Sequence, residues 1–254
     1  MKIACWQATP DDAGAAGLRA VARRAAAAGA ALLVTPELSA TGYLTDAQRL
    51  RALAEPPDGP WAGTVSAIAA EAGIAIVHGG PEADGDRVYN TACLVDRTGR
   101  TVLRYRKSHL YGPVERAAFS PGEDGVKQVE FGGLTLGMLI CYDVEFPEAV
   151  RAHAVAGTQL LVVPTALMTP GEFVATGLVP ARAFENQLFI AYANWTGEGS
   201  GLTYCGLSRI VGPDGRVLSG SGELRYASID LAEIPKAREF SPYLADRRPA
   251  LFAG

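Results

Sequence analysis

The sequence predicts an α/β fold in which helices pack on sheets that mix parallel and antiparallel strands. Three observations support this prediction. Short apolar runs that are typical of buried strands alternate with segments of helical periodicity along the chain. Three pairs of strand-like runs flank glycine-containing turns, which indicates antiparallel hairpins. No proline- and serine-rich linker divides the sequence, so we expect residues 1–254 to form one domain.

The first part of the chain alternates between strands and helices. Strands are predicted where apolar residues follow one another without interruption, and helices where alanine-containing segments run up to a glycine. The predicted elements are strands at 2–7, 31–35 and 74–79 and helices at 18–30 and 61–72. A hairpin with strands at 88–96 and 100–107 then turns at Thr98 and Gly99.

The second part of the chain repeats this alternation with more hairpins. A proline at the start and a glycine at the end mark one helix, at 147–157. A second helix is predicted at 173–187, where Pro180 would kink or break it. The remaining predicted elements are hairpin strands at 126–131 with 134–142 and at 206–211 with 216–221, and single strands at 159–164, 188–194 and 224–231.

Composition and charge argue against several classes of protein. The formal net charge of −4 provides no basic surface for nucleic acid. Arginine, glycine or proline interrupts every apolar stretch before about 18 residues, so we expect no membrane span. The N-terminus lacks a sustained apolar region with a cleavage site, and we therefore expect no signal peptide. The four cysteines are scattered without a C-x-x-C pair, which favours a reduced, cytoplasmic protein.

Cys141 is the strongest candidate for a reactive residue. It ends an apolar strand-like run and comes shortly before a helix that starts at Pro147. A thiol at such a turn lies near backbone N–H groups, which stabilise a thiolate or an oxyanion. Glu37 and Lys107 also follow strand-like runs. We therefore expect an acid, an amine and a thiol at one site that is assembled from one edge of a sheet.

The residues alone leave the base for this thiol open. Histidine is the usual partner of a cysteine nucleophile, and His109 lies close to Lys107 in the sequence. Glu37 is the alternative base, and Lys107 beside it would lower the pKa of the thiol and hold an oxyanion. Taken alone, Cys141 also has a purely structural explanation, because a free cysteine is often only a small buried apolar residue.

Three segments around these residues resemble the signatures of a known family. Residues 34–43 read VTPELSATGY, residues 105–122 read YRKSHLYGPVERAAFSPG, and residues 139–148 read LICYDVEFPE. Together and in this order they are similar to the three signatures of the nitrilase superfamily of carbon–nitrogen hydrolases. The resemblance covers nearly the whole chain, from MKIACWQ at the start to the GPDG turn at 212–215.

This resemblance implies a fold and a set of catalytic roles. The implied fold is a four-layer αββα sandwich with mixed sheets. The implied roles are Glu37 as general base, Lys107 as electrostatic stabiliser and Cys141 as nucleophile. Glu115 corresponds to a glutamate that helps to position the substrate in this family. The backbone N–H of Tyr142 would form the oxyanion hole together with the lysine.

The resemblance also bears on partners. It implies a small-molecule amide substrate, no cofactor and no metal, and a homodimer or larger homo-oligomer. Residues 232–254 form a polar, aromatic tail punctuated by proline, which we expect to lie at the dimer interface.

The segment after the cysteine indicates which bond within the superfamily's range the protein cleaves. Nitrile-cleaving members of the superfamily carry Trp-Glu there, whereas this chain has Tyr142 and Asp143, as in bacterial aliphatic amidases. Some of these amidases act on amides with an ω-amino or ω-guanidino group, and such a cation needs an acid or an aromatic cage. The candidate substrate-binding residues are Tyr43, Tyr111, Glu145 and Trp195. The alternatives are an N-carbamoyl amine hydrolase or a nitrilase, or a non-catalytic protein on the same scaffold.

Overall fold

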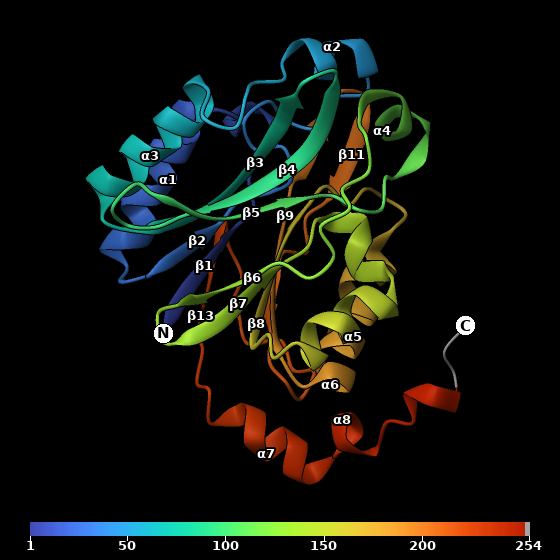
Figure 1. The fold of residues 1–254 in the computed structure, drawn as a ribbon. Helices are drawn as coiled ribbons and strands as arrows, with labels where there is room; N and C mark the ends of the chain where they lie inside the picture. Colours follow the sequence, from blue (N-terminus) through green and yellow to red (C-terminus); the bar gives the residue numbers. More distant parts are fainter. Residues whose placement is uncertain (252–254) are drawn as a thin grey trace.

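Two β-sheets face each other across an apolar core, and helices cover their outer faces (Figure 1). The computed structural model describes residues 1–251. The first sheet has the strand order β13-β1-β2-β3-β4-β5, and the second has the order β12-β9-β8-β7-β6. This arrangement confirms the predicted four-layer sandwich with mixed sheets.

The first sheet is built mainly from the N-terminal half of the chain. Its strands are β1 (Lys2–Trp6), β2 (Leu32–Val34), β3 (Ala75–Asp84), β4 (Arg87–Val95), β5 (Thr101–Arg106) and β13 (Leu224–Ser228). β1, β2 and β3 run parallel, whereas the outer strands pair antiparallel with their neighbours. The helices α1 (Ala15–Ala27) and α3 (Pro60–Ala72) cover its outer face with apolar side chains such as Leu18 and Val65.

The second sheet is built in the same manner from later residues. Its strands are β6 (Gln128–Phe131), β7 (Leu134–Met138), β8 (Leu160–Thr165), β9 (Phe189–Asn194) and β12 (Arg209–Val211). β7, β8 and β9 run parallel, and β8 and β9 are buried at every residue, as their apolar sequences require. The helices α5 (Pro147–Val155) and α6 (Val179–Asn186) cover the outer face of this sheet (Figure 1).

Several short elements were not predicted from the sequence. They are the helices α2 (Ala47–Ala52) and α4 (Gly112–Ala118) and the hairpin of β10 (Thr196–Gly199) and β11 (Leu202–Cys205). Each is too short to display a clear hydrophobic period. α2, α4 and β11 lie at the same end of the molecule, at the top of Figure 1.

Two predicted strands are wrong in part. Residues 216–221 do not form a strand, and only Val217 makes an isolated bridge, to Val211. Val217 is half exposed, so little burial favours a longer ladder there. The strand predicted at 134–142 ends at Met138, because the chain then turns into a short 3₁₀ helix.

The helix predicted at 173–187 consists of two pieces. A π-helical turn at Val174–Leu178 leads directly into α6, and Pro180 occupies the first turn of α6. A proline is tolerated in the first helical turn, because the N–H groups there lack an intrahelical acceptor.

The C-terminal segment packs against α6. It forms α7 (Glu233–Phe240), α8 (Tyr243–Asp246) and a 3₁₀ turn (Pro249–Leu251). The side-chain amide of Gln187 donates a hydrogen bond of 3.0 Å to the carbonyl of Ala237, and the rings of Phe184 and Tyr243 meet edge to face at 5.7 Å. Residues 252–254 of the predicted tail lie outside the described residues. A position of this tail at a dimer interface stays a prediction.

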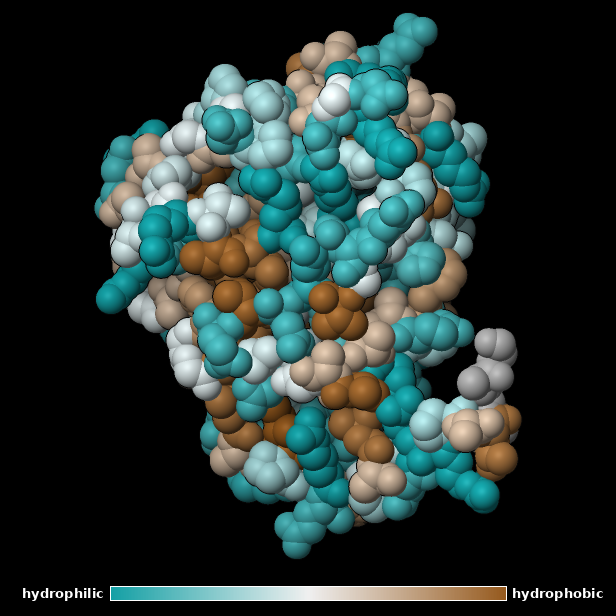
Figure 2. All heavy atoms as spheres, viewed as in Figure 1, coloured by the Kyte–Doolittle hydropathy of each residue, from teal (hydrophilic) through white to brown (hydrophobic). Residues whose placement is uncertain are grey.

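The surface mixes polar and apolar residues. Figure 2 shows hydrophobic residues in separate patches among hydrophilic ones on this face. Phe240, on the C-terminal segment, has 83% of its surface exposed. Within residues 1–251, no helix combines the length and the apolarity that crossing a membrane requires.

We predict that Gly137→Ala destabilises the protein by about 1–3 kcal/mol, because overpacking a buried site forces its neighbours to move. A Cβ atom at Gly137, in the middle of β7, would lie 2.5 Å from Nδ1 of His153 and 2.8 Å from the side chain of Thr158. Gly63→Ala is the matched control, because nothing lies within 4 Å of its Cβ position on α3. Urea unfolding should show Gly63→Ala to be neutral or stabilising, and equal effects of both substitutions would contradict this account of the packing.

Candidate active site

Three polar residues converge where the two sheets meet. Glu37 follows β2 and Lys107 follows β5, both from the first sheet, whereas Cys141 follows β7 of the second sheet. The ammonium of Lys107 lies 2.7 Å from Oε1 of Glu37, and both groups act electrostatically on the thiol of Cys141. The prediction that these three residues lie together is therefore confirmed. The prediction that they share one edge of one sheet is wrong, because both sheets contribute to the site.

Glu37 is fixed by contacts on both its backbone and its side chain. Its backbone N–H donates to the carbonyl of Thr165 at 3.2 Å, and its carbonyl accepts from the indole N–H of Trp195 at 2.8 Å. The side-chain amide of Asn90 donates to Oε1 at 2.7 Å. Within residues 1–251, the buried Oε2 atom has no hydrogen-bond partner. One carboxylate oxygen is thus held and the other is free to take a proton.

Lys107 is a fully buried cation between two carboxylates. Its Nζ atom donates to Oε1 of Glu37 at 2.7 Å and to Oε1 of Glu115 at 2.8 Å. Burial disfavours the ammonium, but the negative charges of Glu37 and Glu115 outweigh burial and hold the pKa of Lys107 well above its usual range. The lysine therefore stays charged at neutral pH.

Glu115 holds this lysine in place and is itself held by α4. Oε1 also accepts from the hydroxyl of Tyr43 at 2.8 Å, and Oε2 accepts from the backbone N–H of Tyr111 at 2.9 Å. Tyr111 is the residue before α4, so the carboxylate satisfies an N–H group that the helix leaves without an acceptor. Tyr43 is buried and supports Glu115 through this hydrogen bond.

Cys141 lies on a strained turn that Asp143 stabilises. Cys141 has a φ of +46°, a region that side chains other than glycine rarely occupy, and it opens the 3₁₀ helix Cys141–Glu145. Oδ2 of Asp143 accepts from the backbone N–H of Ile140 at 3.1 Å and from the hydroxyl of Tyr105 at 2.9 Å. The backbone N–H of Tyr142, in the first turn of this helix, has no intrahelical acceptor and is available to a ligand.

The thiol and its acid neighbour are both shifted toward their neutral forms. Burial and then the negative charge of Glu37 hold the pKa of Cys141 well above its ordinary value. Burial also raises the pKa of Glu37, against the opposing charge of Lys107. At neutral pH the resting site therefore contains a thiol, and the affinity of Glu37 for a proton is increased.

His109 is not arranged as the base for Cys141. Its Nδ1 atom lies 2.7 Å from Oδ1 of Asp143, and its ring stacks on Phe146 with a centroid distance of 3.9 Å. The hydrogen bond to Asp143 raises the pKa of His109. These contacts engage His109 with Asp143 and Phe146 and show none between its ring and Cys141 among the described residues.

A cavity of about 330 Å³ opens onto Cys141, which is within the size range of small-molecule sites. Of the four predicted substrate-binding residues, Tyr111 and Glu145 line it. Tyr43 and Trp195 do not; Trp195 is fully buried and supports the backbone of Glu37, so its predicted contact with substrate is wrong. Residues 166–171 form a further wall of this cavity, which was not predicted from the sequence.

Asn90 was also missed, although it binds the side chain of Glu37. A polar residue in the apolar strand sequence RVYNTACLV was the available signal, because a buried asparagine requires hydrogen-bond partners.

Comparisons with known proteins agree on one family. A family model described as carbon–nitrogen hydrolase matches residues 2–239. The protein named "Hydrolase in pqqF 5'region" from Pseudomonas protegens is 44% identical, over 99% of this chain and 90% of its own. An (R)-stereoselective amidase from Pseudomonas sp. is 41% identical, over 85% of this chain and 79% of its own.

Solved structures of an amidase from Nesterenkonia sp. AN1 are similar over the whole chain. One has a TM-score of 0.84 at 37% identity, and it covers 99% of this chain and 95% of its own. It is a Glu-to-Gln variant with covalent addition of the acetamide moiety of fluoroacetamide at the active-site cysteine. Another, in which the cysteine is also replaced by alanine, is a complex with acrylamide.

We predict that the stability contributed by His109 depends on pH. Its pKa is raised from 6.5 in the folded state, so its contribution is fully present below this value and is lost as pH rises through the folded-state pKa. His109→Gln should therefore cost more stability at about pH 5.5 than at about pH 9. Urea unfolding of both proteins at both pH values measures this difference, and an equal cost at the two pH values would speak against the His109–Asp143 pairing.

Proposed function

This chain belongs to the carbon–nitrogen hydrolase family, and on that basis we propose that it is an amidase that converts a small aliphatic carboxamide to the carboxylate and ammonia through a thioester on Cys141. The observation that carries this proposal is the free Oε2 atom of Glu37 in a buried site with Cys141 and Lys107. The site combines an acid–base group, a nucleophile and a fixed cation, which are the parts that acyl transfer needs.

In the first half-reaction, Cys141 attacks the amide carbon while Glu37 takes the thiol proton. The carbonyl oxygen becomes an oxyanion, which Lys107 and the backbone N–H of Tyr142 stabilise. Such a donor is typically worth roughly 3–4 kcal/mol in the transition state. The C–N bond then breaks, Glu37 returns its proton to the nitrogen, and ammonia leaves a thioester on Cys141.

In the second half-reaction, water hydrolyses the thioester. Glu37 removes a proton from the water, the hydroxide attacks the acyl carbon, and the same groups stabilise the second oxyanion. The C–S bond breaks and the thiolate of Cys141 regains the proton from Glu37. Glu115 keeps Lys107 charged and oriented throughout both half-reactions, as its hydrogen bond to Nζ suggests.

The Nesterenkonia amidase supports these assignments. The glutamate and the cysteine that are altered in its structures are separated by the same number of residues as Glu37 and Cys141. Its complex with acrylamide and its adduct with an acetamide group indicate that small amides reach the corresponding cysteine of that protein.

Within this reaction class we propose a linear amide with a cationic ω-group, such as 5-aminopentanamide or a 4-guanidinobutanamide. Glu145 places a half-buried carboxyl in the cavity wall, with no ion-pair partner within 4.0 Å among the described residues. Tyr111 and Tyr142 line the same cavity with their rings edge to face at 5.2 Å. Residues 166–171 add an apolar wall, which suits an aliphatic linker.

We predict that Cys141→Ala abolishes ammonia release, and that Glu37→Gln lowers kcat by about 10²–10⁴-fold, because removing a general base costs that much. Both variants should still fold, but Glu37→Gln should be less stable than the parent protein, because its amide leaves the buried ammonium of Lys107 with one carboxylate partner fewer. Glu37→Gln should still form a covalent adduct with fluoroacetamide, because fluoride leaves without a proton, and loss of the negative charge of Glu37 lowers the pKa of the Cys141 thiol so that solvent can take its proton. Ammonia assays and intact-protein mass spectrometry measure these outcomes. Undiminished turnover by Cys141→Ala would overturn the mechanism, and carbon dioxide among the products would indicate an N-carbamoyl substrate.

We predict that Glu145→Gln lowers kcat/KM for 5-aminopentanamide about tenfold relative to pentanamide, because a partly desolvated charge pair contributes roughly 1–1.5 kcal/mol. The neutral amide serves as the internal control, since it lacks the cation and keeps the carbon chain. Kinetics with both amides on both proteins give the ratio. An equal loss for the two substrates would show that Glu145 affects the reaction without selecting the cation.

A further inference from the structure

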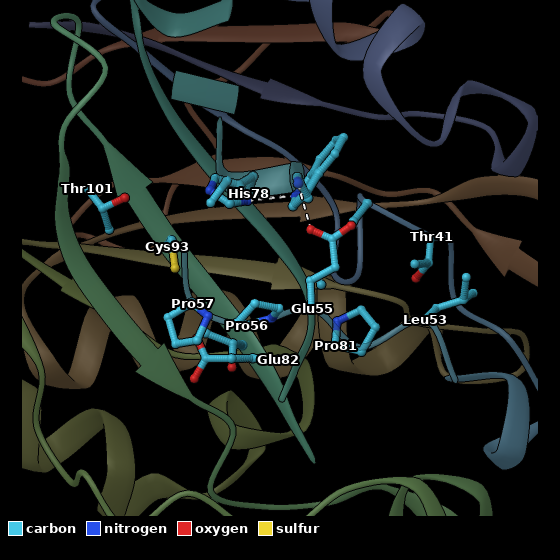
Figure 3. A pocket seen from close by; sticks show the side chains of 15 residues that line it. Thr41, Leu53, Glu55, Pro56, Pro57, His78, Pro81, Glu82, Cys93 and Thr101 are labelled. Atoms are coloured by element: carbon cyan, nitrogen blue, oxygen red, sulfur yellow. Dashed lines mark hydrogen bonds between the residues drawn. The ribbon is translucent and has the colours of Figure 1, made fainter. Parts of the chain in front are cut away.

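A second cavity, of about 210 Å³, lies on the outer face of the first sheet (Figure 3). It shares none of its lining residues with the cavity at Cys141. Its floor is formed by β3 and β4, and segment 53–57 and the start of α3 form its walls. Gly80 provides much of the space, because a Cβ atom there would lie 3.0 Å from the side chain of Ala40.

The floor of this cavity is polar, although it lies on the covered face of a sheet. The register places His78 opposite Cys93, and Gly80 opposite Thr91. The side chains of these residues share the outer face, since successive residues of a strand point to opposite sides. Among residues 1–251, Nε2 of His78 and Oγ1 of Thr91 are buried without a hydrogen-bond partner. Both residues line this cavity, so a polar ligand bound in it would supply the hydrogen-bond partners that these atoms lack.

His78 lines this cavity, and its ring carries a hydrogen-bond donor. The indole N–H of Trp61 donates to Nδ1 at 3.0 Å, which makes Nδ1 an acceptor without a proton. Burial and the nearby charge of Arg104 lower the pKa of His78 to about 4, so the ring is neutral at physiological pH. The single proton of a neutral imidazole must then sit on Nε2. The unpartnered atom is therefore an N–H group that lacks an acceptor.

Glu55 presents an acceptor beside it. One carboxylate oxygen, Oε2, accepts from the backbone N–H of Trp61 at 2.6 Å. Trp61 therefore holds both groups, the imidazole through its ring and the carboxylate through its backbone. Figure 3 shows His78 and Glu55 among the side chains that line this cavity. The other acid of the cavity, Glu82, is neutralised by ion pairs with Arg104 and Arg106.

We propose that this cavity binds a small primary carboxamide, separately from the cavity at Cys141. The carbonyl oxygen accepts from Nε2–H of His78, the amide N–H₂ group donates to Glu55, and the hydroxyl of Thr91 completes the contacts. A carboxylate ligand would be repelled by Glu55, and an ammonium ligand would face the N–H of His78. A neutral group with an acceptor beside a donor fits both.

A ligand bound in this cavity would contact the segments that hold the catalytic glutamate in place. Asn90 and Thr91 are neighbours on β4 and point to opposite faces: Asn90 binds Glu37, and Thr91 lines the cavity. The loop that carries Glu37 also supplies Ala40 and Thr41 to the cavity wall. An amide bound there would therefore rigidify both sides of the strand that holds Glu37. This role rests on the proposed amidase function, whereas the binding itself does not.

Three tryptophans make the test site-specific, because each indole N–H reports a different location. Trp61 contacts His78 in this cavity, Trp195 contacts Glu37 at the active site, and Trp6 contacts Glu223 elsewhere. Titration of ¹⁵N-labelled Cys141→Ala protein with propionamide should shift the Trp61 resonance to saturation and leave Trp6 unmoved. Propionate and propylammonium should shift Trp61 far less. Trp61→Phe identifies the resonance, and Cys141→Ala prevents turnover.

Substitutions in this background separate the two cavities. Thr91→Val should weaken binding measured at Trp61 about fivefold, the cost of one hydrogen bond, and leave binding measured at Trp195 unchanged. Thr91→Ser should restore it, and Thr64→Val, on α3 outside the cavity, should have no effect. The proposal would be overturned if the Trp61 resonance did not shift during the titration with propionamide. Equal shifts with the charged probes would also overturn it, as would a Thr91→Val effect of equal size at Trp61 and Trp195.

Discussion

The buried ammonium of Lys107 is the interaction on which the rest of the site depends. An ion removed from water costs several kcal/mol unless charged partners and hydrogen bonds replace its hydration. Glu37 and Glu115 supply both, at 2.7 and 2.8 Å. They come from the loop after β2 and from α4, so the lysine fixes three separate segments relative to one another. Loss of any one partner would leave an uncompensated buried charge, typically worth about 3–5 kcal/mol.

This charge cluster also explains why the site forms between two sheets. The loop of Glu37 belongs to the first sheet, but its backbone is bound by Thr165 and Trp195, which belong to the second sheet or follow it. The second sheet also supplies the turn of Cys141, which Asp143 holds in a conformation with positive φ. The nucleophile and the acid–base group therefore meet only when the sheets pack correctly. Apolar packing between the sheets thus provides the energy that positions polar catalytic groups.

Much of the fold was predictable from the sequence because its signals are local. The apolar runs of β2, β8 and β9 and the glycine turns of two hairpins mark the layers directly. The motifs pointed to Glu37, Lys107 and Cys141, which the structure brings together, but their predicted grouping at one sheet edge was wrong, since no local pattern tells which strands share a sheet. The prediction that Trp195 contacts the substrate failed for a related reason. Its indole N–H donates a hydrogen bond to the carbonyl of Glu37, which is far away in the sequence. The cavities were not predictable, because their walls come from distant loops.

The balance of charge in the site supports the proposal that the base is a glutamate and not a histidine. Glu37, Lys107 and Glu115 together carry an excess of one negative charge when both carboxylates are ionised. This excess and burial hold the pKa of Cys141 high, so a preformed thiolate, as in a cysteine–histidine ion pair, is disfavoured here. The thiol must instead lose its proton as it attacks, to a base whose own pKa is raised by burial. In the proposed mechanism Glu37 accepts that proton, and the excess negative charge passes to the oxyanion beside Lys107, where a fixed cation stabilises it.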